Sequence, residues 1–131
     1  MKYALHDTEI NIINCNSAGI EFRFAKGVYL LNEQGKEGKL SCPCRMIITI
    51  NDFNSYRMYE HLTVMKSRKS KLSEMAFEDF LKLLEKDSFE VDIDYYSFFG
   101  ASILLIGYCG KFGIEFTITE VAKVEYVFDE E

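Results

Sequence analysis

Apolar and polar residues alternate with a period of two over most of the chain, which is typical of strands with one buried and one solvated face. The clearest alternation covers residues 89–96, where Phe89, Val91, Ile93 and Tyr95 alternate with Glu90, Asp92, Asp94 and Tyr96. We expect the first set of side chains to face the core and the second set to face solvent.

Similar patterns predict strands over 9–14, 20–25, 28–31, 40–50, 56–66, 114–119 and 124–128. The almost continuously apolar run at 101–109 predicts a strand that is covered on both faces. Turn residues at 17–19 and 110–113 separate neighbouring strands. The count is about eight or nine strands.

The period changes to that of a helix once, where apolar residues recur three and four positions apart: Phe77, Phe80, Leu81 and Leu84. This spacing predicts one helix over 74–86, with Ser73 as its N-cap. We therefore expect a single α+β domain over 1–131. Its predominantly antiparallel strands would form a curved sheet, a barrel or a sandwich, and the helix would close one face or end.

The segment 40–50 contains a Cys-Pro-Cys sequence that raises the question of a metal or redox site. As a strand, it places six apolar side chains on one face: Leu40, Cys42, Cys44, Met46, Ile48 and Ile50. Zinc-binding cysteine pairs are usually separated by two to four residues, and these two are separated by one. The pattern favours buried structural thiols without a metal. Pro43 lacks an N–H group and predicts an edge strand.

Net charge and chain pattern limit the classes of partner. The net charge of −6 is unfavourable for general nucleic-acid binding, which depends on neutralising phosphates. No apolar run is long enough to cross a bilayer as a helix, and no signal peptide is recognisable, so we expect a cytoplasmic protein without membrane contact. The richness in Ile, Lys, Asn and Phe is that of a protein from an AT-rich bacterium. A basic protein is the expected partner.

Catalytic and cofactor motifs are not recognisable in the sequence. His6–Asp7 and Glu60–His61 are neighbours in sequence and would point to opposite faces of a strand, so solvated roles are expected. The basic stretch 66–71 has no interleaved aromatic residue and is interpreted as a solvated connection. We expect no catalytic residue, cofactor or metal.

One segment stands out as a candidate partner-binding surface. Its residues combine a row of carboxylates on the expected wet face of a strand with aromatic side chains beyond what one face buries: Glu90, Asp92, Asp94, Tyr96, Phe98 and Phe99. This combination predicts a non-enzymatic protein-binding or inhibitor module, of the kind that an immunity protein represents.

Two other classes remain as alternatives. One is a β-barrel that binds a small apolar ligand in its interior. The other is an enzyme whose Cys, His and carboxylate groups converge only in the folded chain. The sequence does not predict an oligomeric state.

Overall fold

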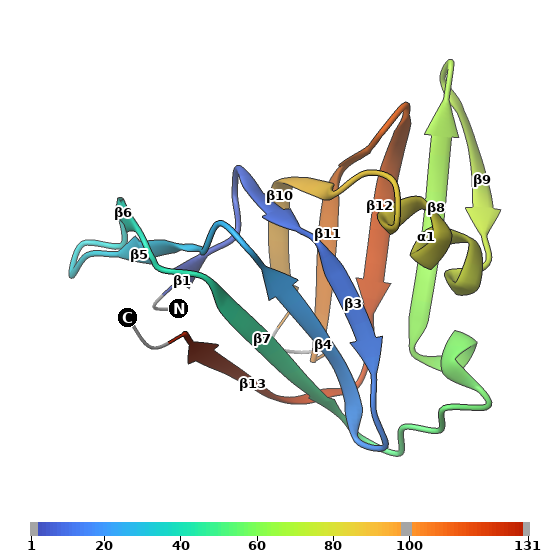
Figure 1. Cartoon of the computed structure of the whole chain (residues 1–131). Helices are drawn as coiled ribbons and strands as arrows, with labels where there is room; N and C mark the ends of the chain where they lie inside the picture. Colours follow the sequence, from blue (N-terminus) through green and yellow to red (C-terminus); the bar gives the residue numbers. More distant parts are fainter. Residues whose placement is uncertain (1–2, 98–100, 130–131) are drawn as a thin grey trace.

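The computed structural model describes residues 3–97 and 101–129 and contains thirteen strands, one α-helix and one short 3₁₀ turn, Met58–Glu60 (Figure 1). The expected α+β fold with mostly antiparallel strands is confirmed. More strands are present than expected because one expected strand is divided and because residues 3–4, 37–40 and 71–75 also form strands. The divided segment is 9–14, which is split at Asn11 between two sheets. Only the second half of 56–66 is a strand.

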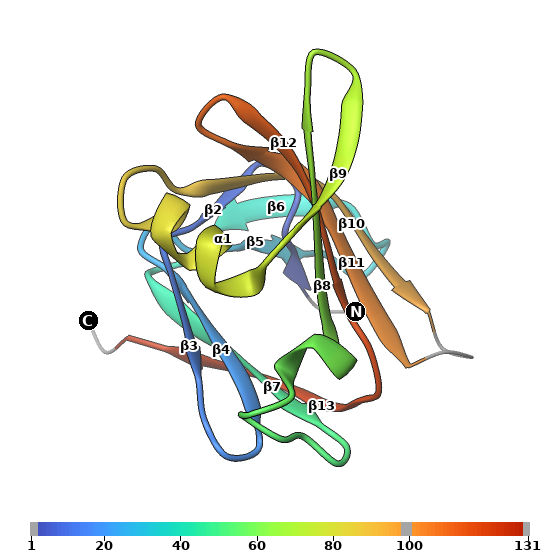
Figure 2. The same cartoon turned by 90° about the vertical axis from the view of Figure 1, so that its right-hand side faces the viewer.

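The largest sheet has six strands in the order β2-β10-β11-β12-β8-β9, and each neighbouring pair is antiparallel. Its strands are β2 (Thr8–Ile10), β10 (Phe89–Ser97), β11 (Ser102–Cys109), β12 (Phe112–Ile118), β8 (Leu62–Arg68) and β9 (Lys71–Met75). The β8–β9 hairpin extends beyond the other strands (Figure 2).

A four-stranded antiparallel sheet lies opposite, in the order β13-β7-β4-β3. Its strands are β13 (Val121–Phe128), β7 (Cys44–Ile50), β4 (Gly19–Phe24) and β3 (Ile12–Cys15). A third, small sheet of β1 (Tyr3–Ala4), β5 (Tyr29–Leu31) and β6 (Glu37–Leu40) lies at the end of the molecule where both termini are found (Figure 1).

The core lies between the inner faces of the two larger sheets. Phe22 of β4 and Phe116 of β12 bring their ring centroids within 6.0 Å of each other, and both side chains are fully buried. Burial of such aromatic surface supplies the main free energy of folding. The described strands form no closed barrel.

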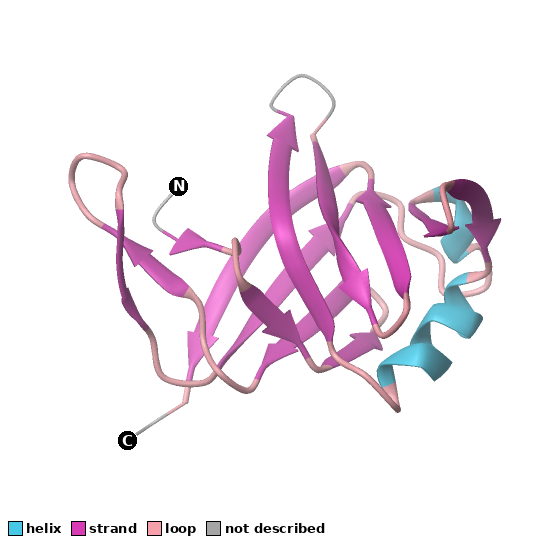
Figure 3. Cartoon of the chain, turned by 90° about the horizontal axis from the view of Figure 1, so that it is seen from above, coloured by secondary structure: helices cyan, strands magenta, loops and turns pink. Residues whose placement is uncertain are grey.

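Helix α1 (Phe77–Leu84) covers one end of this core, as expected (Figure 3). Phe80 is fully buried and meets Phe89 and Phe116 edge to face, with ring centroids 5.6 and 5.5 Å away. The predicted start at residue 74 is wrong, because residues 71–75 pair with β8 as β9. Ala76 is therefore the N-cap residue, and the expected cap at Ser73 does not form.

The Cys-Pro-Cys segment is partly as predicted. The alternation holds from Cys44 to Ile50, where alternate side chains are buried in β7. Leu40 instead belongs to β6 and is exposed, and Cys42 is only half-buried. The edge-strand prediction is wrong, because β7 lies between β13 and β4 and begins one residue after Pro43.

The four cysteines differ in exposure. Cys44 and Cys109 are buried, Cys42 is half-buried and Cys15 is exposed. Burial raises the pKa of Cys109 to about 11, so this thiol stays protonated at neutral pH. No thiol belongs to a group of three metal-ligating side chains within 3–97 and 101–129. In the same part of the chain, no helix combines the length and the apolar character needed to cross a bilayer.

Candidate protein-binding face

A β-bulge interrupts β10 in the middle of the predicted partner-binding segment. The pairing with β11 runs regularly to Val91 opposite Gly107 and continues with Ile93 opposite Ile106. Asp92 is thus one extra residue on the β10 side. An extra residue reverses which positions face inward, because side chains alternate strictly along a strand.

Because of the bulge, four side chains have the opposite orientation to the one predicted from the sequence. Ile93 and Tyr95 face outward and are 39% and 57% exposed, although the alternation placed both in the core. Asp94 and Tyr96 pair with inward-facing residues of β11, although both were expected to face solvent. Glu90 and Asp92 are exposed as expected. Phe98 and Phe99, the remaining predicted partner-binding residues, lie outside the described residues.

Two distant segments hold the bulge in place. Gly107 lies opposite, and a Cβ atom at this position would be 1.8 Å from the carbonyl oxygen of Glu90. Only glycine permits this close approach of the two backbones. On the other side, the Asp7 amide donates to the Val91 carbonyl at 2.8 Å, and His6 Nδ1 bonds to the Asp92 carbonyl. These bonds occupy carbonyl groups on both sides of the bulge.

The outward side chains of β10 and β11 form an apolar surface, which we call the outer face. Ile93 lies opposite Ile106 and Tyr95 lies opposite Leu104, so the four side chains are neighbours across the strands. Tyr108, 58% exposed, extends this surface beside Glu90. The outer face comprises Ile93, Tyr95, Leu104, Ile106 and Tyr108.

Carboxylates flank the outer face at its Tyr108 and Ile106 end, and we call them the acidic rim. Its members stand at outward positions of the six-stranded sheet or at the bulge: Glu9, Glu74, Glu90, Asp92 and Glu115. Lys26 pairs with Glu9 at 2.9 Å, and the other four carboxylates form no ion pair within 4.0 Å among the described residues. None of the outward positions in the described strands of this sheet carries Lys or Arg. The rim is therefore strongly negative.

A small depression of about 130 Å³ lies within the same surface. Tyr108, Leu72 and Glu115 are among the residues that line it. Gly113 lies opposite Tyr108 and also lines the depression, and a Cβ atom at this position would be 2.4 Å from Ser67 Oγ. An apolar wall beside carboxylates suits the aliphatic chain and charged end of a lysine or arginine.

Two half-buried tyrosines, Tyr96 and Tyr126, lie on the inward side of β10 beyond the bulge. The hydroxyl groups of Tyr96 and Tyr126 are buried without a hydrogen-bond partner among the described residues. Burial is the main cause that raises the pKa of both phenols, so both remain neutral at physiological pH. Tyr3 packs on Tyr126 with a centroid distance of 4.5 Å. Tyr3, Tyr126 and Phe128 thus form an aromatic cluster against the core.

The two histidines also depart from expectation. Residues 6 and 7 form a turn in which Asp7 has a φ of 61°, so His6 Nε2 and Asp7 Oδ2 lie 3.2 Å apart where opposite orientations were expected. The bond to the Asp92 carbonyl is the main cause that raises the pKa of His6. His61 is buried, and its Nδ1 atom lies 3.8 Å from Glu120. The two histidines are therefore in unrelated surroundings.

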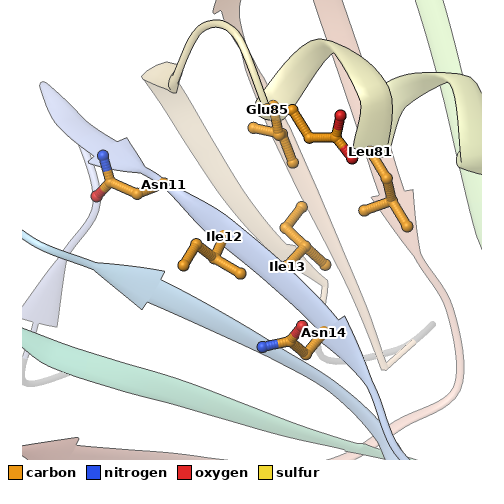
Figure 4. A pocket seen from close by; sticks show the side chains of 7 residues that line it. Asn11, Ile12, Ile13, Asn14, Leu81 and Glu85 are labelled. Carbon is orange, nitrogen blue, oxygen red and sulfur yellow. The ribbon is translucent and has the colours of Figure 1, made fainter.

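Another depression, of about 450 Å³, lies between β3 and α1 (Figure 4). Ile13 of β3 and Leu81 of α1 are among its lining residues, and Glu85 is its one ionisable side chain. It opens to solvent beside the edge of the four-stranded sheet. Its other polar lining residues are Asn11 and Asn14.

The sequence held one signal for the outer face. Residues 102–109 are apolar at both inward and outward positions, which predicted cover on both faces, yet among the described residues no element of the chain covers the outward one. Because the sequence predicted cover on both faces of this strand, it did not predict an exposed apolar surface. Comparisons of this chain with protein-family models, with curated proteins and with solved structures found no match.

Proposed function

We propose that this protein is a binding module that receives a partner protein on the outer face of its six-stranded sheet. The observation that carries the proposal is a strand, β11, that has apolar side chains on both faces, while the described residues of the chain cover only one of them. Contiguous apolar surface with a polar rim is characteristic of protein-binding sites. Tyrosines such as Tyr95 and Tyr108 often anchor such interfaces.

The acidic rim selects the chemistry of the partner. Four of its five carboxylates have no ion pair with a described residue, so a partner with lysine or arginine beside an apolar centre would neutralise them. The depression beside Tyr108 would accept one of these basic side chains. A protein that binds a basic surface in this way would block it, which is the action of an inhibitor or immunity-type protein.

Capture from native extract with matched baits tests this proposal. The three baits are the unaltered chain, a Tyr95→Asp variant and an Ile47→Asp variant. Ile47 is an outward residue of β7 and supplies the same substitution on the other sheet. We expect one basic protein to be retained by the first and third baits and lost from the second. Equal retention by all three baits would place the interface elsewhere.

Association kinetics then separate the rim from the apolar centre. Glu90→Lys should slow association and weaken its dependence on salt, because rim charges mainly accelerate encounter. Tyr95→Ala should mainly speed dissociation, because it removes desolvated contact area. If both variants kept unaltered rates with the captured protein, the outer face would not be its binding surface.

A further inference from the structure

We propose that His6, Asp7 and Asp92 form a binding site for a divalent transition-metal cation beside the bulge of β10. The three residues offer one imidazole nitrogen and two carboxylate oxygens, and these ligand atoms all lie within 4.8 Å of one another. The proposal does not depend on the partner-binding function, because it concerns the β1–β2 turn and the bulge alone.

The backbone of the bulge determines which nitrogen of His6 is available. A carbonyl oxygen only accepts hydrogen bonds, so the Nδ1 atom that faces the Asp92 carbonyl carries the proton. In the neutral ring, Nε2 then presents its lone pair. Metal-binding histidines usually have this arrangement, with the second ring nitrogen held by a carbonyl or carboxylate group.

The lone pair of Nε2 points toward a negative group. Asp7 Oδ2 lies 3.2 Å from Nε2, and neither a neutral Nε2 atom nor a carboxylate oxygen has a hydrogen to share. A positive species must therefore bridge the two atoms. It is either a proton on the ring or a bound cation.

Distances and charge favour a cation as well as a proton. Metal–ligand bonds of about 2.0–2.2 Å place neighbouring ligand atoms about 3.0–3.5 Å apart, which matches the His6–Asp7 separation. The Asp92 carboxylate supplies a third ligand that a proton would leave unused. Asp7 also lines a groove of about 230 Å³ with Glu9, Glu90 and Asp92, where the net charge is strongly negative and water has access to the remaining positions.

The ligand set indicates the class of ion. Calcium and magnesium prefer oxygen ligands, whereas an imidazole with carboxylates suits zinc, manganese and similar divalent ions. Three protein ligands with open positions for water would form a solvent-accessible site. Zn²⁺ is suited to measuring the affinity of the site, and paramagnetic Mn²⁺ is suited to locating the bound ion.

Calorimetric titration of tag-free protein with Zn²⁺, at a pH above the titration of His6, tests the affinity. We expect one ion per chain, and at least tenfold weaker binding in His6→Ala and in Asp92→Asn. The control variant Glu74→Gln removes a rim carboxylate outside the cluster and should bind as the unaltered chain does. All substituted side chains are exposed, and circular dichroism checks that each variant folds. Equal affinity in all four proteins would overturn the proposal, as would the absence of stoichiometric binding.

Paramagnetic broadening by Mn²⁺ locates the ion. The chain has two histidines, so the buried His61 serves as an internal control for the exposed His6. Substoichiometric Mn²⁺ should broaden the ring signals of His6 and leave those of His61 sharp, and Asp7→Asn should remove the effect. Asparagine tolerates the positive φ of this position. A His6 ring that titrates with pH and shows no broadening would mean that a proton alone bridges the pair.

Discussion

The outward faces of the two larger sheets differ in how their charges are balanced. On the four-stranded sheet, Arg45 pairs with Glu21 at 2.7 Å and Lys123 with Glu125 at 3.2 Å. Arg23 of the same face binds both carboxylate oxygens of Asp129. On the six-stranded sheet, carboxylates flank an apolar centre at one end, and no Lys or Arg occupies an outward position of its described strands.

We propose that the face with balanced charges is adapted to water and that the outer face is adapted to a partner. Ion pairs on the four-stranded sheet are satisfied within the chain, and such pairs contribute little to stability but keep a surface solvated. Most carboxylates of the acidic rim have no ion pair with a described residue, and they lie beside an apolar area. Under the proposed function, a partner protein supplies the complementary groups for both features.

The largest effect is expected from the inner faces, which the two sheets share. Phe80→Ala should lower the free energy of unfolding by about 3–5 kcal/mol, because it removes a ring packed on Phe89 and Phe116. Glu78→Ala on the exposed side of α1 should change it by less than about 0.5 kcal/mol. Chemical denaturation of both variants checks this. Equally mild effects would mean that α1 does not cover the core.

A smaller effect is expected from breaking the bulge that creates the outer face. Gly107→Ala should destabilise the protein by about 1–3 kcal/mol, because the new methyl group would meet the Glu90 carbonyl and force the strands apart. Gly38→Ala in exposed β6 is the control, since its Cβ would meet only the Leu30 carbonyl at 3.2 Å. The same denaturation experiment compares them. A Gly107 variant as stable as the control would contradict the tight approach of β10 and β11.

The acidic rim itself should lower stability. Glu9 and Glu90 lie directly opposite each other on β2 and β10, and like charges in this position repel. We expect Glu90→Gln to stabilise the fold by about 0.2–1 kcal/mol, with a smaller gain at high salt. Glu21→Gln on the other sheet removes a paired carboxylate and should not stabilise. A stabilising effect of both substitutions would remove the contrast between the two faces.

The smallest effect is expected from the Arg23–Asp129 ion pair on the four-stranded sheet when the pH is lowered. The bonds from Arg23 lower the pKa of Asp129, so this pair stabilises the fold above the ordinary carboxyl pKa. The contribution is lost as the pH falls through the lowered pKa of Asp129. Unfolding curves of the unaltered chain and Asp129→Asn should therefore converge in acid and separate slightly near neutral pH. Curves that stayed parallel at every pH would show that the pair contributes nothing.

Local periodicity predicted the strands of the core and half of the candidate site. Phe89 and Val91 are buried, and Glu90 and Asp92 are exposed, as the alternation required. The prediction fails from Asp92 onward because the bulge depends on Gly107 and on the turn at His6–Asp7, which are far away in sequence. No pattern within residues 89–96 reports those contacts.

The helix and the outer face show the same limit. Residues 71–75 have a plausible helix start, but pairing with β8 makes them a strand. Residues 102–109 have the composition of a strand that is buried on both faces. Whether both faces are in fact covered depends on where all the other elements of the chain lie. Tertiary pairing decides such cases, and a single sequence does not record it.

The affinity of the captured partner for two matched variants tests the central claim most directly. Tyr95→Ala removes an anchor from the outer face, and Ile47→Ala removes an outward apolar residue from the four-stranded sheet. We predict that Tyr95→Ala raises the dissociation constant at least about tenfold, as expected for a buried anchor, and that Ile47→Ala leaves it within about twofold. Loss of affinity in Ile47→Ala with none in Tyr95→Ala would contradict the account.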